Sequence, residues 1–127
     1  MIGKFGLAVA AVLVSAAPAL ADSSICGSAP IAPAAIDGTK ATEAQMKDAH
    51  DDVVNFIKAS DDYQACLFND LDQQKAAAAK SKDGKPLDQG IIDAVNAKVA
   101  SNQKTKEKVG AEYNAAVHAY KGAHPKA

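Results

Sequence analysis

The chain has 127 residues and a formal net charge of −1, with no tryptophan and no arginine. The charge is unevenly distributed: residues 22–74 contain ten acids and three lysines, a net of −7, whereas residues 75–127 contain ten lysines and five acids, a net of +5. Nucleic-acid binding calls for clustered basic side chains with aromatic rings for base stacking. Here the lysines are interspersed with alanines, so we expect no nucleic-acid partner.

The first 21 residues have the pattern of a cleaved export signal. Lys4 gives a positive start, residues 5–17 are apolar and uncharged, and Ala-Leu-Ala at 19–21 matches the small-x-small pattern of signal peptidase sites. An apolar run of about 13 residues is too short to span roughly 30 Å of hydrocarbon as a helix. We therefore expect a signal peptide over 1–21, no membrane anchor after cleavage, and a periplasmic or secreted protein.

Two cysteines, Cys26 and Cys66, are the only ones in the chain. Thiols pair and stay paired in an oxidising compartment. The sequence has no C-x-x-C motif and no histidine beside either cysteine, which favours a structural disulfide over a metal or redox site. Closing a loop of about 40 residues is worth roughly 4 kcal/mol in the chain-entropy account of disulfide stabilisation.

Residues 22–41 precede the first helical pattern and are rich in proline and glycine. Pro30 and Pro33 favour extended, polyproline-like backbone. Asp37-Gly38 is a turn signal near the end of the segment. We expect an extended arm rather than a domain.

A long amphipathic helix is predicted over residues 43–81, where the chain has no glycine or proline. Thr42 and Gln45 fit a capping box at its start. Its apolar residues recur at heptad-like spacing: Met46, Ala49, Val53, Phe56, Tyr63 and Leu67.

A second helix is predicted over 87–121. Asp83-Gly84 supplies a turn, Pro86 can begin a helix but not continue one from upstream, and Gly122 favours an end.

Two long helices joined by a short turn lie antiparallel. The sequence therefore predicts an all-α protein, in which residues 42–127 form an antiparallel two-helix hairpin and the arm over 22–41 is pinned to it by one disulfide. Residues whose numbers sum to about 168 should then lie side by side, with the acidic first helix beside the basic second one.

Three carboxylates in the first helix are candidate metal ligands. Asp48, Asp51 and Asp52 are spaced i, i+3 and i+4, so they share a helix face. Their oxygens suit a hard cation such as Ca²⁺ or a lanthanide, although a full shell of six or more oxygens would need water or a second chain. The alternative interpretation is a solvated face. No cofactor is required by the sequence.

The sequence offers no basis for catalysis. It has no Gly-rich phosphate loop and no G-x-S-x-G motif, and no cysteine is left over as a nucleophile once the two pair. We expect a protein that is not an enzyme.

A second apolar stripe in the first helix is a candidate partner surface. It consists of Val54, Ile57, Phe68 and Leu71. These positions lie beside the seam, which is the main apolar stripe that faces the other helix, and on the flank opposite Cys66. We expect this stripe to pair with a second hairpin in a homodimer, or with another envelope protein. The alternative is that the arm crosses over and buries it.

The stretches "CGSAPIAPAAIDGTKAT", "SDDYQACL" and "VGAEYNAAVHAYKGAHP" resemble a set of small, mostly uncharacterised exported helical-hairpin proteins of Gram-negative bacteria. In size, helical character and its Asp-rich helix the chain is also similar to small periplasmic lanthanide-handling proteins. The resemblance implies a helical fold and a periplasmic location. The expected function is a non-catalytic binding or interaction module that self-associates; the alternative is a periplasmic hard-cation binding protein or metal chaperone.

Overall fold

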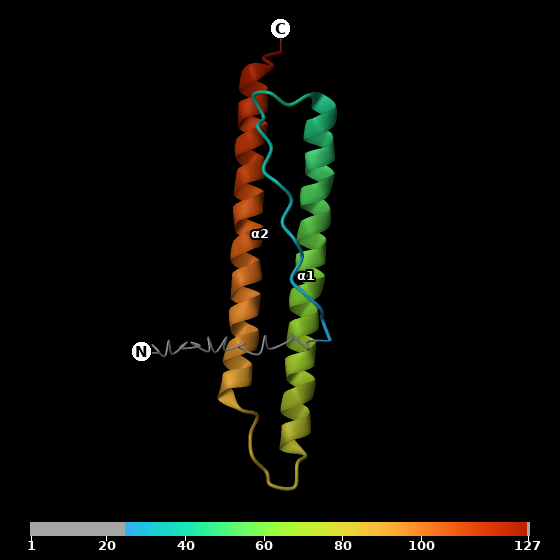
Figure 1. Cartoon of the computed structure of the whole chain (residues 1–127), viewed down its shortest axis with the longest axis vertical. Coiled ribbons are helices and arrows are strands. Elements are labelled where there is room, and N and C mark those ends of the chain that lie inside the picture. Colours follow the sequence, from blue (N-terminus) through green and yellow to red (C-terminus); the bar gives the residue numbers. More distant parts are fainter. Residues whose placement is uncertain (1–24, 127) are drawn as a thin grey trace, which may run out of the picture.

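Two long helices make up most of the structure, α1 over Glu43–Ala79 and α2 over Gln89–Ala123 (Figure 1). The computed structural model describes residues 25–126, and the signal peptide expected over 1–21 lies outside them. The helices run antiparallel and pack against each other along their length. The predicted all-α hairpin is confirmed, with a disulfide joining the N-terminal segment to it.

The start of α1 is set by the predicted capping box. The Gln45 backbone N–H donates to Thr42 Oγ1 at 3.2 Å, and the Thr42 backbone N–H donates to Gln45 Oε1 at 2.9 Å. Both bonds satisfy backbone donors that a helix N-terminus otherwise leaves without partners. The helix therefore begins where the sequence predicts.

The turn between the helices is longer than predicted. Gly84 has a φ of 63°, which suits the turn, and Asp83 accepts bonds from the Ser81 hydroxyl and the Lys85 backbone N–H. These bonds lower the pKa of the Asp83 carboxyl. The α2 N-cap is Asp88, whose carboxylate accepts from the Gly90 N–H at 2.7 Å. The second helix thus begins after Asp88 because that side chain, and not Pro86, caps it.

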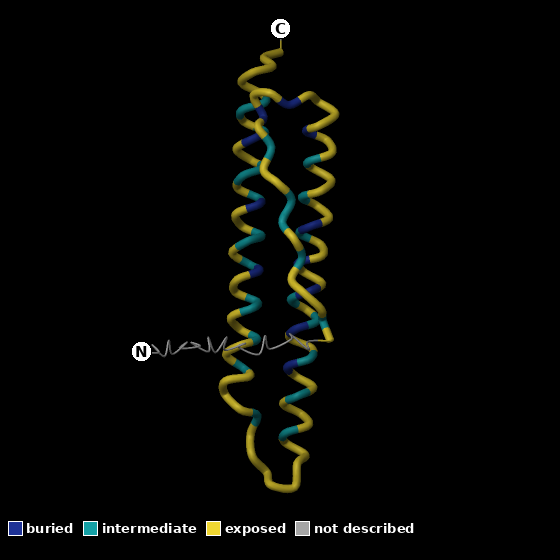
Figure 2. The backbone as a smooth tube through the Cα atoms, in the orientation of Figure 1, coloured by how far each residue is buried: buried dark blue, intermediate teal, exposed yellow. Residues whose placement is uncertain are grey.

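The seam of α1 departs from a strict heptad near its end. Its buried residues are Met46, Phe56, Ser60, Tyr63, Leu67 and Leu71. From Phe56 to Leu67 they follow steps of four, three and four residues, and the next step is again four, to Leu71. An α-helix has 3.6 residues per turn, whereas a heptad repeat averages 3.5, so a strict heptad stripe slowly rotates away from the partner helix. A step of four residues in place of three rotates the stripe back towards that helix. Leu71 therefore lies in the core, 3 % exposed. Figure 2 shows that the buried positions of the two helices lie on the sides that face each other.

A polar layer crosses the middle of the seam. Ser60 and Asn102 are both buried, and Asn102 Nδ2 donates to Ser60 Oγ at 3.2 Å. Gln64 Nε2 donates to Asn102 Oδ1 at 2.8 Å. At its edge Lys106 pairs with Asp61. Within residues 25–126 no buried side-chain nitrogen or oxygen lacks a hydrogen-bond partner, so this layer favours one register over its neighbours.

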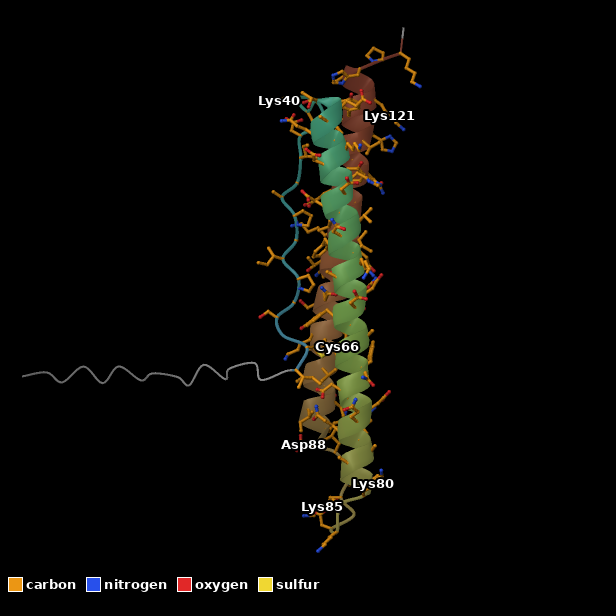
Figure 3. All side chains as sticks on the ribbon, turned by 90° about the vertical axis from the view of Figure 1, so that its right-hand side faces the viewer. Lys40, Cys66, Lys80, Lys85, Asp88 and Lys121 are labelled. Atoms are coloured by element: carbon orange, nitrogen blue, oxygen red, sulfur yellow. A yellow bond between two sulfur atoms is a disulfide. The ribbon has the colours of Figure 1, made fainter. Side chains whose placement is uncertain are left out.

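The arm runs back along the hairpin as an extended chain (Figures 1 and 3). The Cys26–Cys66 disulfide pins one end, with the two Cα atoms 5.7 Å apart. Pro30, Pro33 and Ile36 are each partly buried. A polyproline II helix has about three residues per turn, so this spacing places all three on the face towards the helices.

The other end of the arm is seated on α2 at Gly38. This glycine is buried, and a Cβ atom built on it would lie 1.9 Å from the Ala116 carbonyl oxygen. Its φ is not positive. Glycine is therefore needed here for close backbone approach, with Ala41, Met46 and Ala116 packed in the same cluster.

Replacing Ser60 by alanine tests the polar layer. Ser60→Ala removes the acceptor of the buried Asn102 amide, so we expect the free energy of unfolding to fall by about 1–3 kcal/mol. Urea unfolding followed by circular dichroism measures it. The matched control is Ser101→Ala, at an exposed position, which should change stability by less than about 0.5 kcal/mol. Equal losses in the two variants would contradict a role for this layer.

Two glycine-to-alanine changes test the seat of the arm. Gly38→Ala must displace the turn from α2, and we expect it to lower the unfolding free energy by about 1–3 kcal/mol. Gly122→Ala adds the same methyl group where nothing lies within 4 Å, and should leave stability unchanged or raise it. Denaturant midpoints compare them, and a Gly38→Ala protein as stable as the parent would contradict the close contact.

Candidate functional site

The seam between the helices has two sides, and the arm covers only one of them. On α1 the arm lies beside Gln45, Asp48 and Asp52, which occupy the same flank as Cys66. Residues 25–126 show no crossing of the arm to the other flank (Figure 3). The molecule therefore has a covered flank and an open flank, and each has its own surface chemistry.

A groove lies on the covered flank, between the arm, the first turns of α1 and the facing part of α2. It encloses about 510 Å³. We name it the arm groove. Its lining includes Ile36, Ala49, Val53, Val109 and Tyr113 on an apolar floor, and four carboxylates (Asp37, Asp48, Asp52 and Glu112) with one lysine (Lys40) at its rim. Three separate segments of the chain thus supply one concave surface.

Two of the four rim carboxylates have partners. Asp37 accepts from the Thr39 hydroxyl at 2.6 Å and from the Thr39 N–H at 3.0 Å, and these bonds lower the pKa of its carboxyl. Lys40 lies 3.8 Å from Asp37. Glu112 forms an ion pair with Lys108 at 3.6 Å.

The other two rim carboxylates, Asp48 and Asp52, have no ion pair or hydrogen bond from their side chains within residues 25–126. Both are exposed and lie one helical turn apart. Among the described residues, they are the rim carboxylates that have no ion pair.

The three predicted metal-ligand candidates are only partly brought together. Asp48 and Asp52 line the arm groove, whereas Asp51 does not and lies 3.2 Å from His50 Nδ1. Within the described residues, no three His, Cys, Asp or Glu side chains form a group that could hold a metal ion. Metal binding by these aspartates stays a prediction.

The open flank carries a shallower groove with aromatic residues. It encloses about 710 Å³ and is lined in part by Met46, His50, Tyr113, Val117 and Tyr120. The His50 and Tyr113 ring centroids are 5.9 Å apart. On α1 its residues lie on the opposite side of Met46 from Asp48 and Asp52, so this groove faces away from the arm.

The predicted partner stripe lies mainly on this open flank. Val54 and Phe68 are 48 % and 46 % exposed, and Ile57 is partly buried. Leu71 is the exception, because the drift of the seam described above turns it into the core. The stripe that remains is interrupted halfway by the Asp61–Lys106 pair.

Sequence reasoning missed the arm groove and the part that Asp37 and Glu112 play in it. The spacing of Pro30, Pro33 and Ile36 was a usable signal, because three-residue steps in a proline-rich segment mark one face of a polyproline helix. The contribution of α2 could not be found in this way, since it depends on the side on which the arm lies.

Comparison with protein-family models, curated proteins and solved structures finds no match to this chain. Neither helix of the described segment is long and apolar enough to cross a membrane. We therefore infer function from the geometry of the two flanks.

Proposed function

We propose that the protein works by binding rather than by catalysis, as an exported helical module that self-associates through its open flank. One observation carries this proposal: the arm covers one side of the seam, while Val54 and Phe68 stay about half exposed on the other. On α1 the exposed large apolar side chains both lie on this flank, and such a stripe is typical of a surface that meets a partner.

The size of the core supports a helical partner. Only eight apolar residues are buried in the described chain. Antiparallel helix pairs bury their seams fully when they combine into four-helix bundles. A second hairpin laid on the open flank would cover Val54, Ile57 and Phe68 together with the aromatic groove.

The distribution of charge supports a second copy of the same chain. Helix α1 contains eight acids and three lysines, and α2 contains five lysines and three acids. In a two-fold dimer, α1 of one copy can lie beside α2 of its partner, which places unlike charges together on both sides. Exposed ion pairs add little stability each, but such complementarity selects orientation.

The disulfide supports a location of the protein in an oxidising compartment. Cys26 and Cys66 are bonded to each other, and such bonds persist outside the reducing cytosol. Together with the signal pattern over residues 1–21, this supports a periplasmic or secreted location.

The self-association proposal predicts the behaviour of residues 22–127 in analytical ultracentrifugation. We expect a dimer at high micromolar concentration, and a monomer for the Val54→Asp/Phe68→Asp variant, because each charge would be buried without a partner. The matched control is Ile31→Asp, which alters an apolar side chain that is 93 % exposed on the arm, and it should remain dimeric. A parent protein that sediments as a strict monomer would refute the proposal.

Hard-cation binding is the second candidate function. It is supported by the position of Asp48 and Asp52, which line one groove and have no ion pair within residues 25–126. A cation there would take its remaining oxygens from water or a second copy. Titration with Ca²⁺ and La³⁺ should then show saturable binding below millimolar, lost in Asp48→Asn/Asp52→Asn. Absence of saturation in that range would refute metal binding. Dimerisation that requires the metal would show that the cation and the self-association belong to one function.

A further inference from the structure

We propose that the arm groove binds a small organic cation, an amine with an apolar body. In this arrangement the hydrocarbon part lies on the floor of the groove and the ammonium group lies between Asp48 and Asp52. The site lies on the covered flank and shares only Tyr113 with the groove on the open flank that carries the proposed self-association.

The floor of the groove suits the apolar part of such a molecule. Val53 of α1, Val109 of α2 and Ile36 of the arm line it from three sides, and Tyr113 adds an aromatic ring. Its volume of about 510 Å³ lies within the roughly 300–1,000 Å³ found for small-molecule sites. Burial of apolar surface against these side chains favours a ligand with a hydrocarbon body.

The rim selects the sign of the ligand's charge. Asp37 and Glu112 are engaged with Lys40 and Lys108, so within residues 25–126 the rim carboxylates left without an ion pair are Asp48 and Asp52. Spacing of i, i+4 places both carboxylates on one face of α1, where a single ammonium group could donate a hydrogen bond to each. An anion of the same shape would be repelled.

The apolar floor also distinguishes an organic cation from a bare metal ion. A metal ion is held by its oxygen ligands alone and gains nothing from Val53, Val109 or Tyr113. An amine with a hydrocarbon body uses both the carboxylates and the floor. The combination of the two surfaces in one groove is what favours the organic ligand.

The arm that forms one wall of the groove is tied to the helices at both of its ends. The disulfide fixes the arm at Cys26, and the contact between Gly38 and the Ala116 carbonyl fixes it at the other end. Pro30 and Pro33 restrict the backbone between these points. A wall that is ordered before binding reduces the entropy that a ligand must overcome.

The test uses phenethylammonium as the probe and oxidised residues 22–127 as the protein. Isothermal titration should show saturable binding with a dissociation constant of roughly millimolar, as expected for a ligand of this size. Phenylacetate has the same ring and the opposite charge, and methylammonium has the charge without the ring; each should bind at least about tenfold more weakly. Nuclear magnetic resonance should locate the binding through shifts at Val53, Val109 and Tyr113.

Two double variants separate the site from general electrostatics. Asp48→Asn/Asp52→Asn removes the two rim charges and should weaken phenethylammonium binding by about fivefold or more. The matched control, Asp51→Asn/Asp72→Asn, removes the same number of charges from exposed positions of α1 that do not line the groove, and should change binding by less than about twofold.

Three results would overturn the proposal: no saturation by 20 mM probe (about twentyfold above the expected constant), equal binding of phenylacetate, or equal weakening in both double variants. Retained amine binding in Val54→Asp/Phe68→Asp is expected, because that variant alters only the open flank. Failure of self-association and failure of ligand binding are thus distinguishable in the same set of proteins.

Discussion

A pair of antiparallel helices exposes two sides of its seam to water, and in this protein the Cys26–Cys66 disulfide holds an extended chain over one of them. Two helices have no further element of their own with which to close either side. The arm supplies a partial third layer, with Pro30, Pro33 and Ile36 turned towards the helices. Because the disulfide lies on one flank, it decides which side becomes a lined groove and which stays open. The two candidate surfaces are consequences of that single cross-link.

The polar layer at the middle of the hairpin complements this constraint. A seam made only of small and aliphatic side chains would allow neighbouring registers at similar energy. The buried Ser60–Asn102 bond and the Gln64 amide beside it are satisfied in one register, and a shift would leave buried polar groups without partners. Residue numbers in the Asp61–Lys106 and Gln64–Gln103 pairs both sum to 167, close to the predicted value. Register in turn decides that Val109 and Tyr113 face the arm groove.

The two flanks suit different kinds of partner. The open flank is long and apolar with a polar interruption, which matches another helix pair better than a small molecule. The arm groove is short, concave and rimmed with carboxylates, which matches a small cationic ligand. Tyr113 is the residue that lines both grooves. The other residues of the arm groove, including Ile36, Val53 and Val109, belong to that groove alone.

Local patterns in the sequence determined the secondary structure. Two helices are specified by the capping box at Thr42 and Gln45, the turn at Gly84 and the near-heptad spacing of apolar residues, and none of these signals depends on tertiary contacts. The pattern of an export signal over residues 1–21 and the count of two cysteines were enough to predict the cross-link. Only the tertiary structure decided that Leu71 is buried, because drift of the helix against the heptad accumulates along α1 and is corrected by contact with α2. It also decided that Asp48 and Asp52 share a groove with Glu112 while Asp51 turns to His50. Such neighbours come from three segments distant in the chain, and no local pattern encodes the side on which an arm is laid.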